Sequence, residues 1–282
     1  MREHHTLWAL PPVAHALSAA LMLVARVCLL LLLVAVWRAN DPPITVDLFV
    51  GDFLALVLAP ELCARLIGRA FEGHASVETG RLEVMRGGRR MEVPCTSIAR
   101  ALAWRLPLPQ PGLTFTLRSG ARFPARLALP DPARLLDELA AAGLAPARDA
   151  LTHPAVRYAA ARAAWPRRWY DRPIFKVLVF ALLPGGIGFY AHQHIAFGGL
   201  LGQYYLMGLA AWLRSAATYW LTGALYLALW AGLFHIAVES LLLSAAYAAP
   251  ERAGGARRIA ERAATALFYI SVPALLAVRF LA

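Results

Sequence analysis

Residues 13–37 read VAHALSAALMLVARVCLLLLLVAVW, and this stretch decides the fold class. A helix needs about 20 apolar residues to cross a hydrocarbon core roughly 30 Å thick, and the stretch meets that length. It is longer than the apolar part of a signal peptide and lacks a clean small-residue cleavage site. We therefore expect it to be retained as a first membrane span.

The whole chain follows the same pattern, with 60% hydrophobic and only 16% charged residues, where soluble domains have roughly a quarter charged. The length rule predicts four clear spans and a possible fifth, over about 15–37, 48–67, 174–194, 216–247 and 264–281. The expected organisation is a transmembrane hairpin (1–70), a polar domain (71–146), a juxtamembrane segment (147–173) and a C-terminal transmembrane region (174–282).

Arginine placement predicts the orientation, because cytoplasmic flanks of spans are enriched in Lys and Arg. The loop 39–46 contains Asn40 and Asp41 but no base, whereas Arg65 and Arg69 lie at the end of the second span. We therefore expect the N-terminus and the polar domain to lie in the cytoplasm, and the protein to sit in a bacterial inner membrane. Residues 195–213 would give an odd number of crossings if they spanned, which favours a re-entrant or interfacial helix.

The net charge of +11 comes almost wholly from arginine, with Lys176 the only lysine. A GC-rich genome and anionic lipid explain this charge, and no nucleic-acid-binding motif accompanies it. The three cysteines, at 28, 63 and 95, have no metal-binding or disulfide spacing. The sequence therefore predicts no nucleic-acid partner, no metal and no cofactor.

Short alternating runs in the polar domain predict strands, with tight turns at Gly87-Gly88 and Ser119-Gly120. Asp131 as N-cap, Pro132 at the first helical position and Gly143 as a stop predict one short closing helix.

This order, with the strand, glycine turn and strand of residues 84–93, a strand ending in Phe123-Pro124-Ala125-Arg126 and a closing helix, resembles the bacterial PH-like domains attached to membrane spans. The resemblance covers about 70 residues and carries no catalytic or ligand motif. The expected fold class is thus an α-helical integral membrane protein with four to five transmembrane helices and an inserted small β-rich, PH-like α+β cytoplasmic domain. The resemblance implies a curved sheet that binds protein partners or headgroups, and no enzyme activity. Three prolines between Pro107 and Pro111 depart from the pattern.

The segment before the third span interleaves bases with aromatic residues, which is typical of an anchor at the inner leaflet. Its lipid-interface candidates are Arg157, Arg162, Trp165, Arg167, Arg168, Trp169 and Arg172.

Ionisable residues within spans are costly unless they are paired or face water. Arg26 and Glu239 both fall within about half a bilayer of the cytoplasmic face, so they could form an intramembrane pair or mark a proton or substrate path. His235 lies four residues before Glu239 on one helical face. Two such ligands are too few for a metal, although a haem held by His15 and His235 stays open.

Residues 184–188 interrupt the third span and could expose backbone to a substrate, or simply form a packed kink. The close-packing and broken-helix candidates are Pro184, Gly185, Gly186, Gly188, Gly198 and Gly202.

Three functions follow from these features, in decreasing order of support. The first is a non-catalytic membrane subunit or scaffold that binds a protein partner and anionic inner-leaflet lipid through its cytoplasmic domain. The second is a component that translocates lipid or a small molecule. The third is a membrane enzyme or haem or metal protein that uses intramembrane His and Glu.

Overall fold

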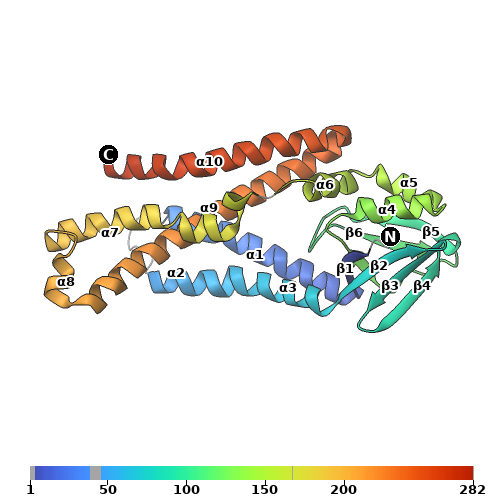
Figure 1. Ribbon diagram of the computed structural model, residues 1–282, viewed down its shortest axis with the longest axis horizontal. Coiled ribbons are helices and arrows are strands. Elements are labelled where there is room, and N and C mark those ends of the chain that lie inside the picture. Colours follow the sequence, from blue (N-terminus) through green and yellow to red (C-terminus); the bar gives the residue numbers. More distant parts are fainter. Residues whose placement is uncertain (1–3, 39–45, 167, 282) are drawn as a thin grey trace. The chain divides into compact units, whose positions relative to one another are not determined.

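The computed structural model describes residues 4–38, 46–166 and 168–281. Most of these residues are helical. The strands form a separate, curled antiparallel sheet (Figure 1). The chain forms two compact units. The sheet unit contains the described residues of Met1–Ala25, Leu58–Pro166 and Glu239–Ala260, and the helical unit those of Arg26–Val57, Arg167–Val238 and Glu261–Ala282.

Seven strands form the sheet, in the spatial order β4-β3-β2-β1-β7-β6-β5. Their bounds are β1 His5–Leu10, β2 Glu72–Glu78, β3 Arg81–Arg86, β4 Arg89–Pro94, β5 Ile98–Ala103, β6 Gly112–Leu117 and β7 Arg126–Ala128. Each neighbouring pair is antiparallel. Two meanders, β2 to β4 and β5 to β7, are therefore joined through β1.

The hairpin turn predicted at Gly87-Gly88 is confirmed. Arg86 pairs with Arg89 across it, and both glycines have positive φ, at 52° and 78°. Glycine reaches this region without the steric cost that a Cβ brings. Gly120, with φ of 83°, turns the chain between Thr116 and Arg122, which bridge each other.

The predicted closing helix is also confirmed, as α4 (Pro132–Ala141). The Asp131 carboxylate accepts a hydrogen bond from the Ala133 amide, which caps the helix. Leu135, Leu136 and Leu139 are fully buried in the core that the strands of the sheet also line. Figure 1 shows α4 lying beside the sheet. The structure adds two helices that the sequence does not predict, α5 (Ala145–Leu151) and α6 (Pro154–Ala163), and α5 extends the core past residue 146.

Strand β1 is the main feature of the sheet that the sequence does not predict. It lies before the first apolar helix, and its Leu7 and Ala9 side chains enter the same core as α4. Its partner β2 follows the second helical segment, and paired residues are 64 positions or more apart in the chain, for example Leu7 and Gly73. The sheet is thus built from chain on both sides of the predicted transmembrane hairpin.

That hairpin consists of α1 (Pro12–Arg38) and a returning helix made of α2 (Val46–Asp52), a π-helical stretch (Phe53–Leu58) and α3 (Ala59–Ala70). At its root in the sheet unit, the Ala9 amide donates to the Phe71 carbonyl at 2.8 Å, and the buried Ser18 hydroxyl donates to the Ala64 carbonyl at 3.1 Å. A side chain at Gly68 would overlap the Trp8 ring. The chain therefore leaves and re-enters the sheet at adjacent points.

Three helices among the described residues are long and apolar enough to cross a membrane: Pro12–Val36, Phe175–Phe197 and Leu209–Ala248. The predicted spans over 48–67 and 264–281 stay predictions. The predicted loop 39–46 falls almost wholly on residues outside those described.

In the helical unit, α7 (Leu182–Phe197) and α9 (Leu209–Ala248) are joined by the short helix α8 (Gly202–Met207). Residues 195–213 are therefore divided among the end of α7, α8 and the start of α9. Helix α9 packs against α1 through Leu225 and Leu229, and against α10 (Ala253–Leu281) through Leu227. At about 1.5 Å per residue, a helix the length of α9 exceeds the roughly 30 Å of a hydrocarbon core.

Candidate functional sites: a buried charge cluster and a polar cavity

Glu239, singled out by the sequence, lies at the centre of a cluster of charged side chains in the sheet unit. Arg257 of α10 binds it with two hydrogen bonds, Nη1 to Oε2 at 3.0 Å and Nη2 to Oε1 at 2.8 Å. The Tyr158 hydroxyl of α6 donates to Oε2, and Arg162 Nε lies 3.7 Å from Oε1. This carboxylate therefore joins three helices.

Small side chains let these helices come close together. Ala155 and Ala159 of α6, Ala246 of α9 and Ala253 of α10 are all buried, and α6 contacts the turn Pro250–Arg252 that links α9 to α10. Tyr158 is 3% exposed and Arg257 is 5% exposed. A buried charge is costly unless it is paired, so these contacts favour the arrangement that holds α6, α9 and α10 together. We call this cluster the clamp.

The surroundings of the cluster change the pKa of Tyr158, which lies on α6 outside the candidate spans. Burial, reinforced by the neighbouring Glu239 carboxylate, raises the pKa of Tyr158 to about 12. Both causes disfavour a phenolate. Tyr158 therefore stays protonated and remains a donor to Glu239 at every physiological pH.

The other intramembrane candidates lie elsewhere. Arg26 lies on α1 in the helical unit, and its pairing with Glu239 stays a prediction. His235 lies on α9 in the helical unit, where it lines a cavity. His15 accepts from Arg126 Nη1 at 2.9 Å and packs edge-on against Trp104. Within the described residues, no group of three or more His, Cys, Asp or Glu side chains could hold a metal ion.

The predicted lipid anchor is divided between the units. Arg157, Arg162 and the half-buried Trp165 belong to the sheet unit. The exposed residues Arg168, Trp169 and Arg172 precede the candidate span Phe175–Phe197 in the helical unit. Arg167 lies outside the described residues.

Within this anchor, the aromatic rings form a chain. Trp169 packs edge-on against Tyr170 and Phe175, and Arg168 donates to the Tyr170 hydroxyl at 2.6 Å. Trp169 is 63% exposed. An exposed indole with guanidinium groups beside it suits the headgroup region of a bilayer.

The third span is interrupted before the glycines, between the π-helical stretch Phe175–Val179 and the start of α7 at Leu182. Helix α7 then runs unbroken through Pro184, Gly185, Gly186 and Gly188. The Leu178 carbonyl accepts from the Trp220 indole at 2.9 Å, and the Phe180 carbonyl accepts from the Leu183 amide. Protein groups thus occupy these backbone acceptors, which is the arrangement of a packed kink.

The remaining candidates serve packing or turns. A Cβ at Gly185 would come within 2.8 Å of the Trp220 Cα atom, and one at Gly188 would crowd Tyr219. Gly198 ends α7 with φ of 72°, and Gly202 lies close to the Phe197 carbonyl.

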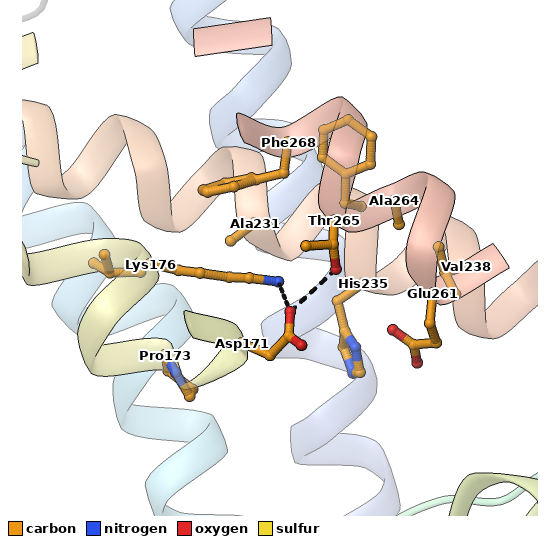
Figure 2. A pocket seen from close by; sticks show the side chains of 12 residues that line it. Asp171, Pro173, Lys176, Ala231, His235, Val238, Glu261, Ala264, Thr265 and Phe268 are labelled. Atoms are coloured by element: carbon orange, nitrogen blue, oxygen red, sulfur yellow. Dashed lines mark hydrogen bonds and ion pairs between the residues drawn. The ribbon is translucent and has the colours of Figure 1, made fainter. Parts of the chain in front are cut away.

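The helical unit also contains a cavity of about 190 Å³ between α9, α10 and residues 171–177. Its polar lining residues are Asp171, Lys176, His235, Glu261 and Thr265 (Figure 2). Lys176 Nζ lies 3.1 Å from Asp171 Oδ1, and the Thr265 hydroxyl donates to the same oxygen at 3.1 Å. Apolar walls come from both helices, including Ala231, Phe234, Val238, Ala264 and Phe268.

Comparisons with protein-family models, with curated proteins and with solved structures find no match for this chain. The two sites and the sheet unit are therefore the features that bear on function.

Sequence reasoning missed most of these partners. It singled out Glu239 because a charge in an apolar run needs compensation, but Tyr158 and Arg257 were assigned no role. It also assigned no role to Asp171, Glu261 or Thr265. A usable signal was the four-residue spacing of Arg257 and Glu261, which repeats that of His235 and Glu239 on the preceding helix.

Proposed function

We propose that the protein is a non-catalytic membrane subunit whose PH-like sheet unit binds a protein partner and whose basic and aromatic segment before α7 binds anionic lipid. The observation that carries this proposal is the pairing of β1 with β2. Because β1 precedes the hairpin of α1 to α3 and β2 follows it, the sheet is attached to both ends of that hairpin. Two adjacent attachments hold a domain close to the membrane surface far better than one flexible linker.

The form of the sheet supports the PH-like assignment. Seven antiparallel strands form two meanders joined through β1, and α4 covers the core as the resemblance implies. The exposed edge strand β4 carries charge, and Arg90 bridges Glu83 and Glu92 at 2.7 Å each. Charges along this edge discourage unspecific strand pairing there, which favours recognition of a partner through side chains.

The anchor supports the lipid part of the proposal. Arg168 and Arg172 are exposed beside Trp169 at the start of a candidate span. Each base near an anionic surface contributes about 1 kcal/mol, so two of them contribute about tenfold or more in lipid affinity.

The lipid test compares matched pairs of arginines. The double variant Arg168→Gln/Arg172→Gln is expected to lose about tenfold in affinity for phosphatidylglycerol, measured by lipid exchange in nanodiscs and by lipid retention in native mass spectrometry. The control Arg118→Gln/Arg122→Gln removes two exposed arginines from the β6–β7 turn and leaves the anchor intact. Equal losses in both variants, or none in either, contradict the lipid assignment.

The partner test uses a photo-crosslinking amino acid at Met85, which is 43% exposed on β3. In native membranes we expect one recurrent crosslinked protein. A crosslinker at Leu213 of α9, which is 51% exposed, serves as the control and should not capture the same protein. Identical products from the two positions count against a partner surface on the sheet.

A further inference from the structure

The loop between β5 and β6, residues 104–111, carries the three prolines that depart from the PH-like pattern. Because proline fixes its own φ, alternating prolines stiffen the loop. Its return to the sheet is packed, since Pro109 and Pro111 are buried and the Leu129 amide donates to the Pro111 carbonyl at 2.8 Å. Leu106, in contrast, is 65% exposed. The loop therefore presents an apolar side chain on a rigid support.

Two contacts within the sheet unit hold this loop beside the ends of helices. The Trp104 ring packs edge-on against His15, in the first turn of α1, with ring centroids 4.3 Å apart. The Tyr247 hydroxyl, in the last turn of α9, donates to the Arg105 carbonyl at 3.1 Å. Both α1 and α9 contain candidate spans. The loop thus lies at the sheet end of two helices that could cross a membrane.

A charged pair on α3 indicates the depth of the loop. Glu61 and Arg65 form an ion pair on the surface of α3, and charged side chains favour water or headgroups over hydrocarbon. The Ser18 hydroxyl of α1 donates to the Ala64 carbonyl, so Ser18 lies level with that pair. His15 lies three residues nearer the sheet along α1, which is about 4.5 Å by helix rise. The loop that contacts His15 therefore lies at the level of the headgroups.

The side chains at this level suit the boundary between headgroups and hydrocarbon. Val13 and Leu17, on the first two turns of α1, are exposed, as is Leu106. Arg105 is exposed between Trp104 and Leu106. Aromatic and basic side chains gather at the headgroups, where a guanidinium meets phosphate and an aliphatic side chain reaches the acyl chains.

We propose that the loop 104–111 inserts Leu106 into the interfacial layer of the bilayer and places Arg105 on the phosphate of an anionic lipid. The occupant of this surface is thus the membrane in which α1 lies. The proposal rests on α1 crossing that membrane, and it is independent of the partner surface on β3 and of the anchor before α7. A contact away from the root of the hairpin fixes the tilt of the sheet unit against the bilayer.

The first experiment places a benzophenone amino acid at Leu106 of the full-length protein, in nanodiscs of phosphatidylglycerol and phosphatidylcholine in equal amounts. Illumination should join this position to lipid, and intact-protein mass spectrometry identifies the lipid by its mass. The control position is Ser119, exposed on the β6–β7 turn. Its neighbour Arg118 donates from its amide to the Ser97 carbonyl, at the opposite end of β5 from the loop. No lipid adduct at Leu106, or equal yields at the two positions, overturns the proposal.

The role of Arg105 is tested by lipid selectivity in the same nanodiscs. One base near the phosphates should make the adduct at Leu106 favour phosphatidylglycerol over phosphatidylcholine about fivefold. Arg105→Gln should remove this preference, because it removes the charge and keeps most of the side chain. Arg118→Gln, at an exposed arginine of the β6–β7 turn, is the matched control and should keep the preference. A preference that Arg105→Gln leaves unchanged overturns the assignment of Arg105.

Native membranes distinguish lipid from protein as the occupant of this surface. The same photo-reactive position should again give a lipid adduct there, and a protein adduct in its place overturns the proposal. Because the reporter lies on the β5–β6 loop, its result does not depend on crosslinks from Met85 or on lipid binding by Arg168 and Arg172. Failure of this proposal and failure of the proposed function can therefore be told apart.

Discussion

The buried cluster and the open cavity use the same two helices with opposite results. Glu239 follows His235 by four residues on α9, and Glu261 follows Arg257 by four residues on α10. In the cluster, Glu239 is bound by Tyr158 and Arg257 and neither partner is exposed by more than 5%. One helical turn away, His235 on α9 and Glu261 on α10 line the cavity. Small buried residues thus bring the helices together around Glu239, whereas the residues one turn away line a cavity.

The largest expected effect comes from breaking the clamp. Glu239→Gln removes the carboxylate charge that Arg257 binds through two hydrogen bonds and that Arg162 approaches to 3.7 Å, and leaves the buried Arg257 without this counter-charge. Such a change costs about 3–5 kcal/mol, measured by reversible unfolding in mixed micelles. The matched control is Glu251→Gln at an exposed glutamate.

A double-mutant cycle sharpens this result. Replacing both members of a buried pair costs less than leaving one charge alone. The double variant Glu239→Gln/Arg257→Gln is therefore expected to be more stable than Glu239→Gln. Additive losses would show that the two side chains do not act as a pair.

The next effect is a loss of stability in alkali. The folded pKa of Tyr158, about 12, exceeds the ordinary value of about 10. Stability from this group is complete below pH 10 and is lost as the pH rises from about 10 to 12, by roughly 3 kcal/mol. The measurement is the tyrosinate absorbance difference between the wild type and Tyr158→Phe. A difference spectrum that titrates near pH 10 contradicts a buried Tyr158.

At neutral pH, Tyr158→Phe has a smaller effect. It removes one donor from Glu239 while Arg257 still binds both carboxylate oxygens. We expect a loss of about 1–2 kcal/mol, measured by the same unfolding experiment. Tyr205→Phe, at a residue that is 75% exposed, should change nothing. A loss as large as that of Glu239→Gln would show that the tyrosine, and not the arginine, holds the clamp.

The parts of the fold that could be predicted are those with local causes. Helix α4 was predictable because Asp131 and Pro132 set its start and three leucines set its buried face. The turn at Gly87-Gly88 was predictable because it requires positive φ. Strand β1 was not, since only its pairing with β2 and β7, distant in sequence, makes six residues a strand.

The candidate sites show the same division. Glu239 could be singled out from its apolar surroundings alone, but Tyr158 lies 81 positions before it and Arg257 lies 18 positions after it. No local pattern brings those residues together. Asp171 and Thr265, 94 positions apart, are likewise joined only by packing.

The smallest expected effect is that of Glu261→Gln on stability, and it tests the comparison directly. Glu261 lines the cavity and is half-buried, and Gln keeps the size and shape of its side chain. Substitutions at such positions change stability by about 0.5 kcal/mol or less, and the same unfolding experiment measures this change. If Glu261→Gln destabilises the protein as much as Glu239→Gln, then the cavity carboxylate is also a structural clamp. A small loss of stability would show that the carboxylate of the cluster, and not that of the cavity one helical turn away, holds the helices together.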